Sequence, residues 1–160
     1  MSSKKKEELE VNAFMVNSKT NTKSHEWFLD SGASEHMSWN KELFQEMYKV
    51  KIPRMVQVGN GQKLEVRGYG KIKLWAYNGT SLIETCLSNV LYIPDLKFNL
   101  FSAGCALDNG YFLSSDNEKC TFYDKNGKIR AQAIRQNKLY TMCFSQEKSY
   151  VKCLQDQQLT

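Results

Sequence analysis

The residues with the clearest chemical potential follow a short apolar run near the start of the chain. Residues 27–29, Trp-Phe-Leu, predict a buried strand, and Asp30 then carries a carboxylate into a turn of small residues. An ionised group at the end of a buried strand is costly unless hydrogen bonds or a partner charge hold it. Two interpretations fit this placement: a turn-capping Asp that accepts backbone N–H bonds, and a carboxylate held in place for catalysis.

Other reactive side chains are arranged less favourably. Ser31 could act as a nucleophile with His36 as its base, but a Gly-x-Ser-x-Gly motif is absent and no residue that would orient His36 is identified. Five cysteines lie at wide spacings without a C-x-x-C pair, and the two histidines do not form a zinc motif. We therefore expect reduced thiols, no metal site and no other cofactor.

The elements around Asp30 are typical of a mainly β protein. Four Asn-Gly dipeptides begin at positions 60, 78, 109 and 126, and three of them separate runs of β-forming residues. Asn-Gly accepts the positive φ angles of tight hairpin turns, so the pattern predicts three hairpins. The expected strand pairs are 54–58 with 64–66, 71–77 with 81–87, and 119–123 with 128–134; residues 90–93 predict a further buried strand, and residues 68–70 a bend or bulge.

Two segments favour helices instead. Ser38 or Asn40 can cap a short helix that runs to Met47. Residues 99–107 predict a second helix, which ends at Gly110 in a left-handed conformation.

Length and composition predict one soluble domain. The chain has 160 residues, 41% of them hydrophobic, and a net charge of +5 from interleaved signs. No apolar stretch is long enough to span a membrane, and the interleaved charges argue against a nucleic-acid surface. We expect a polar linker at residues 1–24, a domain at 25–140 and a tail at 141–160; residues 11–16 could form an edge strand or remain loose.

Four segments together resemble the protease of copia-type long-terminal-repeat retrotransposons, which belongs with the retroviral aspartic proteases, or retropepsins. The resemblance runs from about Trp27 to about Tyr140 and keeps the order and spacing of the segments. The segments are 29–34 (Leu-Asp-Ser-Gly-Ala-Ser) followed by His36-Met37, 90–96 (Val-Leu-Tyr-Ile-Pro-Asp-Leu), 99–102 (Asn-Leu-Phe-Ser) and 137–140 (Asn-Lys-Leu-Tyr).

The resemblance implies a mainly β, retropepsin-like acid protease fold: a small closed β-barrel with one short helix after the second apolar strand, assembled as a homodimer. An aspartic protease needs two carboxylates that share a proton. The chain has one Asp-Ser-Gly, so the second Asp30 is expected from a second copy. The apolar residues between positions 90 and 102 are then core, and His36 is structural or interfacial.

Residue roles follow from the same resemblance. Asp30 would be the catalytic carboxylate, Ser31 would bond across the dimer, and Gly32 would let the substrate backbone approach. A mobile hairpin is also required, and residues 58–62 provide the candidate tip, although an ordinary surface hairpin would have the same sequence. The expected substrate-binding residues are Ala33, Ser34, Gly59, Asn60 and Gly61.

These roles predict an endopeptidase that cleaves peptide segments of its own Gag-Pol-type polyprotein, in the cytoplasm within virus-like particles. A second interpretation is a domesticated retropepsin-like domain that dimerises or binds peptides without useful turnover. A third is a basic nucleic-acid module that binds through residues 4–6 and scattered lysines. We rank the third last, and expect no membrane partner.

Overall fold

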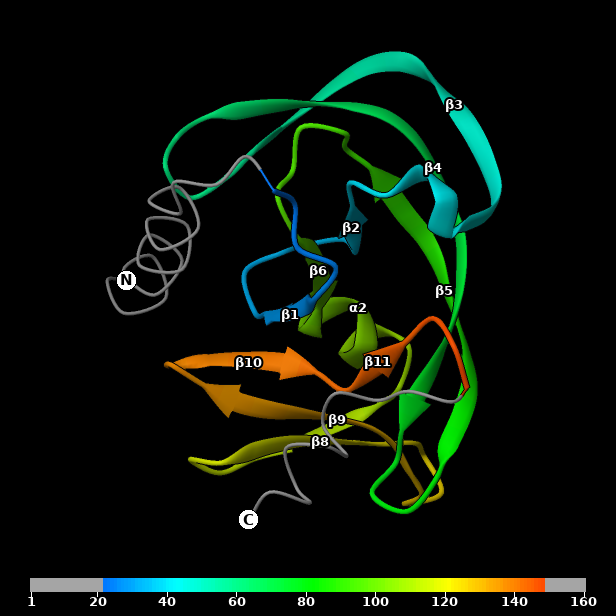
Figure 1. The fold of residues 1–160 in the computed structure, drawn as a ribbon, viewed down its shortest axis with the longest axis vertical. Helices are drawn as coiled ribbons and strands as arrows, with labels where there is room; N and C mark the ends of the chain where they lie inside the picture. The colour runs from blue at the N-terminus through cyan, green and yellow to red at the C-terminus, as the bar shows by residue number, and fades with distance from the viewer. Residues whose placement is uncertain (1–21, 149–160) are drawn as a thin grey trace.

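The computed structural model describes residues 22–148 as a predominantly β unit. Its strands join one hydrogen-bonded sheet in the order β11-β4-β5-β2-β6-β1-β10-β9-β8-β7, and β3 pairs with β4 outside this path. Figure 1 shows β3, β4 and β5 arching over one side of the unit, with helix α2 near its centre. No helix within residues 22–148 is long and apolar enough to cross a membrane.

The element bounds are β1 Trp27–Asp30, β2 Met37–Ser38, η1 Lys41–Leu43 (a 3-10 helix), β3 Phe44–Gln57, β4 Lys63–Tyr77, β5 Leu82–Tyr92, β6 Asn99–Ser102, α2 Ala103–Asp108, β7 Phe112–Ser115, β8 Lys119–Tyr123, β9 Ile129–Gln136, β10 Leu139–Met142 and β11 Phe144–Ser145.

The Asn-Gly turns form the three predicted hairpins. Gly61, Gly79 and Gly127 have φ angles of 82°, 100° and 79°, in the left-handed region that glycine enters without a steric penalty. The antiparallel pairs β3–β4, β4–β5 and β8–β9 confirm the prediction. Gly110, with a φ of 88°, follows α2, as expected for the end of that helix.

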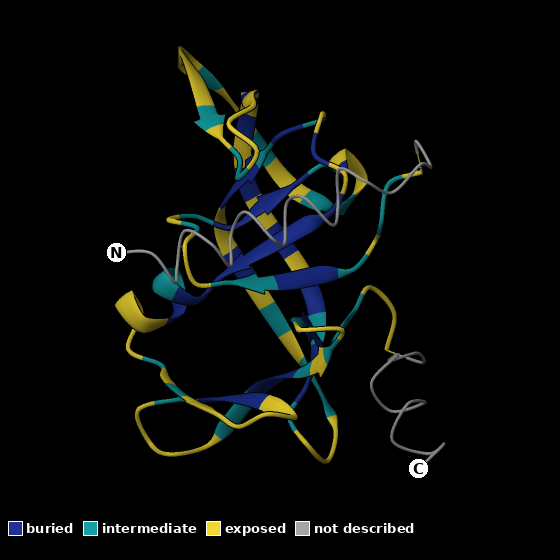
Figure 2. Cartoon of the chain, turned by 90° about the vertical axis from the view of Figure 1, so that its left-hand side faces the viewer, coloured by how far each residue is buried: buried dark blue, intermediate teal, exposed yellow. Residues whose placement is uncertain are grey.

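Two apolar clusters hold the sheet together, and strand β4 contributes to both. Buried and exposed residues alternate along most of β4, because one face packs inward and the other meets solvent. Figure 2 shows the buried segments crossing the middle of the unit. The first cluster includes Trp27, Ile72, Leu74, Phe101 and Phe122; the second includes Phe28, Leu64, Val66, Leu91, Ile93, Leu96 and Leu100. The expected core residues between positions 90 and 102 are therefore confirmed.

Strand β1, which ends in Asp30, lies between strands from distant parts of the sequence. It pairs in parallel with β6, so that Asp30 lies opposite Ser102, and antiparallel with β10 through Phe28 and Thr141. The fully buried Asn99 fixes the start of β6, because its Oδ1 accepts a hydrogen bond of 2.5 Å from the Ser38 hydroxyl. The position of Asp30 is thus set by neighbours on both sides.

Both predicted helices are shorter than expected. Asn40 does cap a helix, but this is the three-residue η1, and Phe44 then begins β3 opposite Ile72. Residues 99–102 form β6 rather than the first turn of a helix, and α2 begins at Ala103 with Ser102 as its N-cap. In both places strand pairing outweighs a short helical pattern, which has little intrinsic stability.

The expected barrel does not close within residues 22–148. The terminal strands of the sheet, β11 and β7, pair with β4 and β8 respectively and not with each other. A closed barrel requires hydrogen bonds between the first and last strands of the sheet. Strand β11 has only two residues, and these pair with Trp75 and Ala76 of β4. The mainly β class is confirmed, whereas the closed barrel is not observed.

Ordered contacts also involve residues close to the two expected domain borders. At the start, the Ser24 N–H donates to the Lys97 carbonyl at 2.7 Å, and the Trp39 indole donates to the Ser24 carbonyl at 2.7 Å. At the other end, Met142 and Cys143 are buried in the core. The segment 11–16 lies outside the described residues.

The cysteines depart from the expectation of reduced thiols at one position. Cys86, Cys105 and Cys120 are free, whereas Cys143 is disulfide-bonded. Burial raises the pKa of the Cys120 thiol to about 11, which keeps it protonated and unreactive.

Gly70 allows β3 and β4 to approach each other closely. A Cβ at this position would lie 1.8 Å from the Glu46 carbonyl oxygen, and the β4–β5 register shifts between Gly70 and Ile72, as the predicted bend requires. We expect Gly70→Ala to lower the free energy of unfolding by about 3 kcal/mol, because backbone must move to relieve the clash. Urea denaturation of the full chain measures the change.

Gly104→Ala is the matched control. Its Cβ would come no closer than 3.6 Å to Ser102 Oγ, and the residue lies in α2, where alanine is favoured over glycine by about 1 kcal/mol. Equal destabilisation by the two substitutions would contradict the close approach at Gly70.

Candidate functional site

Asp30 occupies the end of β1 and begins a tight turn. Its side chain is half-buried, and Oδ1 accepts a hydrogen bond of 2.8 Å from the Gly32 N–H. The turn-capping interpretation therefore describes the local geometry. Within the described residues Oδ2 makes no hydrogen bond, so one oxygen holds the turn while the other is available for chemistry.

Hydrogen bonds fix the backbone of the loop that follows Asp30, while its two serine side chains are exposed. The Ala33 carbonyl accepts from the Ser102 hydroxyl at 2.6 Å, and the Ser34 carbonyl accepts from Cys105 Sγ at 3.1 Å. Ser31, Gly32 and Ser34 are exposed, and Ala33 is half-buried. Ser31 and Ser34 therefore face solvent from a backbone that is anchored to β6 and α2.

His36 is a buried structural member of this loop. Its Nδ1 accepts from the Ser102 N–H at 2.9 Å, and its ring stacks on Phe101 with centroids 4.5 Å apart. Nδ1 must be unprotonated to accept, and burial lowers the pKa of His36 to about 4, which keeps the ring neutral. No hydrogen bond joins His36 to Ser31 within the described residues, so the geometry favours the structural interpretation over a Ser-His pair.

The candidate hairpin tip lies between β3 and β4. The Val58 N–H donates to the Gln62 carbonyl at 2.9 Å, and Asn60 Oδ1 accepts from the Gln62 N–H, which closes the turn that contains Gly59 and Gly61. In the view of Figure 1 this turn lies at the upper left, above the loop that follows β1. The structure thus places the five predicted substrate-binding residues in two segments, the loop and the hairpin tip.

One ion pair joins the hairpin to the loop. The Arg54 guanidinium donates through Nη1 and Nη2 to the two carboxylate oxygens of Glu35, and the Nη1 to Oε1 distance is 3.1 Å. This pairing also raises the pKa of Arg54 further above its usual value. Sequence reasoning missed the pair, because nothing in the pattern relates two charges that are nineteen positions apart.

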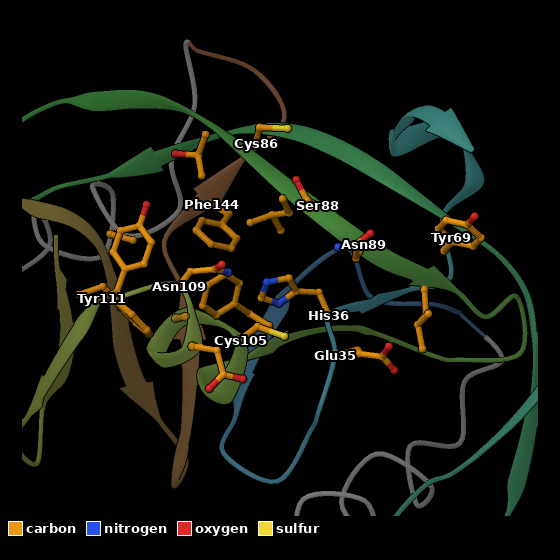
Figure 3. A pocket seen from close by; sticks show the side chains of 18 of the residues that line it. Glu35, His36, Tyr69, Cys86, Ser88, Asn89, Cys105, Asn109, Tyr111 and Phe144 are labelled. Atoms are coloured by element: carbon orange, nitrogen blue, oxygen red, sulfur yellow. The ribbon is translucent and has the colours of Figure 1, made fainter. Parts of the chain in front are cut away.

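A cavity of about 940 Å³ opens beside the same loop. Figure 3 shows His36, Asn89 and Cys105 around it, with β5 on one side and α2 on another. Glu35, Arg54 and Tyr69 also line it, whereas Asp30 is not among the lining residues. No sequence pattern indicates this cavity, because its walls come from many separate elements.

No cluster of three or more His, Cys, Asp or Glu side chains that could hold a metal ion occurs between residues 22 and 148. Glu35 is the other carboxylate of the loop, and both of its oxygens are bonded to Arg54. Asp30 is therefore the loop's carboxylate with an oxygen free of hydrogen bonds.

Comparisons with known proteins relate the chain to the Pol region of retrotransposons. It is 32% identical over 116 residues to the Retrovirus-related Pol polyprotein from transposon TNT 1-94 of Nicotiana tabacum, and 30% identical over 81 residues to the Putative transposon Ty5-1 protein of Saccharomyces cerevisiae. The alignments cover 72% and 51% of this chain but only 8% and 49% of those relatives. No solved structure matches it. Residues 27–111 match the family described as "Pol polyprotein, beta-barrel domain", and the chain belongs to that family.

Proposed function

We propose that this chain is a retrotransposon aspartic endopeptidase that cleaves its own Gag-Pol-type polyprotein. The observation that carries the proposal is the placement of Asp30. Its carboxylate stands at the end of a strand held on both sides, in a turn closed by the Gly32 N–H, with Oδ2 unbonded. The relation to retrotransposon Pol proteins supports a substrate of the same origin.

The proposed mechanism requires a second copy of the chain. Two carboxylates a few ångströms apart share one proton, so that one accepts a proton from the attacking water and the other donates to the scissile carbonyl. Glu35 cannot serve as the second carboxylate, because Arg54 occupies both of its oxygens. A second Asp30 across a two-fold axis supplies it.

The exposed side of the loop suits such an assembly. Ser31 and Gly32 are exposed and lie next to Asp30, so a second copy can approach without disturbing the core. Two identical loops would then face each other, with each Ser31 hydroxyl able to bond across the axis. The peptide would lie extended between these loops and the hairpin tips, with Ala33, Ser34 and residues 59–61 as its contacts.

A second candidate function is retained because of one observation. The matching family is described as a barrel domain, without reference to catalysis, and the large cavity beside the loop does not include Asp30. A domesticated domain that dimerises or binds peptides without useful turnover would have the same fold. Cleavage that depends on Asp30 separates the two functions.

Asp30→Asn replaces the carboxylates that would share a proton. We expect the rate of cleavage to fall at least about 10³-fold while the chain remains folded. Asn keeps an oxygen that can accept from the Gly32 N–H, so the turn survives. The measurement is the appearance of fragments from a polyprotein that contains this chain and its flanking Pol sequence. Asp95→Asn, at an exposed position outside the loop, is the control and should cleave normally. Persistent cleavage by Asp30→Asn would refute the role of Asp30.

Dilution should lower the activity per chain, because the site is complete only in the dimer. Below the dissociation constant of the dimer, specific activity is expected to fall in proportion to concentration. An excess of Asp30→Asn chains should likewise inhibit the wild-type chain by forming dimers with one carboxylate. Sedimentation equilibrium gives the dimer fraction for comparison. A specific activity that stays constant while the dimer dissociates would argue against a shared site.

His36 is expected to limit the stability of the loop in acid. Its pKa is about 6.5 when unfolded and about 4 when folded, so between these pH values the unfolded chain binds a proton that the folded chain excludes. The contribution of the neutral His36 ring to the free energy of unfolding is complete above pH 6.5. It falls by up to about 3 kcal/mol as the pH drops to about 4. Urea denaturation across this pH range measures the loss.

His36→Asn keeps an acceptor for the Ser102 N–H but does not titrate, so its stability should vary less with pH over this interval. His25→Asn, which changes an exposed ring, is the control and should follow the wild type. Identical pH profiles for His36→Asn and the wild type would contradict this assignment.

A further inference from the structure

We propose that Glu35 and Arg54 are positioning residues, whose bidentate ion pair holds the outer half of the β3–β4 hairpin over the Asp30 loop. The inference rests on the proposed function and deepens it, since it assigns substrate affinity to a contact outside the carboxylate pair. Neither residue needs to touch the reacting atoms. They act by fixing the distance between the loop and the hairpin that covers the peptide.

The break in the β3–β4 ladder makes this tether necessary. The register shifts between Lys49 and Arg54, so residues 50–53 leave the ladder, and regular pairing resumes with Arg54 opposite Val66. Arg54 is therefore the first residue of the outer half of the hairpin. A bulge bends the strand and weakens its attachment at that point. The ion pair therefore connects Arg54, where the ladder resumes, to Glu35 on the loop that follows Asp30.

The geometry of the pair fits a positional role better than a stabilising one. The side chains of Arg54 and Glu35 are 45% and 30% exposed, and a pair in that setting contributes little to overall stability. Its two parallel hydrogen bonds nevertheless fix a direction as well as a distance. Both residues line the cavity beside the loop, so the pair forms part of the cavity wall.

Breaking the pair should therefore change substrate affinity more than turnover. We expect Glu35→Gln and Arg54→Gln each to raise KM about three- to fivefold, with kcat within about twofold of the wild type. The KM of Arg54→Lys should lie between those of the wild type and Arg54→Gln, because a lysine ammonium keeps the charge but cannot make the bidentate contact. The substrate is a peptide that spans the first junction mapped in the polyprotein assay.

Charge reversal and salt provide the specific readouts. The double variant Glu35→Arg/Arg54→Glu should recover most of the lost affinity, which a merely structural role for either residue would not produce. High ionic strength should raise the KM of the wild type but not that of the double variant Glu35→Gln/Arg54→Gln.

The control is the ion pair between Lys73 and Glu84, whose Nζ and Oε1 atoms are 3.5 Å apart. Their side chains are 50% and 57% exposed, and they join β4 to β5 away from the loop. Glu84→Gln should leave KM unchanged. An unchanged KM for Glu35→Gln, or an equal rise for Glu84→Gln, would overturn the inference.

Hydrogen exchange separates this inference from the proposed function. Amides of residues 54–57 should exchange about three- to fivefold faster in Glu35→Gln than in the wild type, and at the wild-type rate in Glu84→Gln. If the wild-type polyprotein is not cleaved, the proposed function fails, and equal exchange rates then also overturn the tether. If cleavage depends on Asp30 while exchange and KM are unaffected by Glu35→Gln, only the tether is refuted.

Discussion

The buried hydroxyl of Ser102 is the contact on which the geometry of the Asp30 loop depends. It donates to the Ala33 carbonyl and accepts from the Cys105 N–H, while the Ser102 N–H donates to His36. Ser102 is fully buried, so water cannot replace any of these partners and each loss would leave a polar group unsatisfied. Two points of the loop and the start of α2 are thus fixed by one residue, whose own place is set by the pairing of β6 with β1.

This arrangement divides the site into a fixed part and an adjustable part. The loop is fixed through the Ala33 carbonyl and the His36 ring, which both bond to the fully buried Ser102. The hairpin is attached by an antiparallel ladder that is interrupted at residues 50–53 and by a solvent-accessible ion pair. Under the proposed function, this division would keep the Asp30 carboxylate in place while the hairpin moves to admit and release a peptide.

Local signals predicted most of the fold, and contacts between distant residues account for what they missed. The Asn-Gly turns located three hairpins, because the turn conformation depends on two residues alone. The helix expected to run to Met47 ends at Leu43, because Phe44 pairs with Ile72 on a strand that no local pattern relates to it. At the site, Asp30 was identified from its neighbours in sequence, whereas Ser102 and Arg54 were not assigned roles there, since their partners lie on other elements.

The two neighbours of β1 also determine when the site can form. Its hydrogen-bonding partners begin at Asn99 on one side and include Thr141 on the other, so the strand that carries Asp30 waits for nearly the whole domain to leave the ribosome. Pairings between such distant positions form slowly and late in folding. The turn that carries Asp30 therefore cannot be held on both sides until the chain has been synthesised at least as far as Thr141.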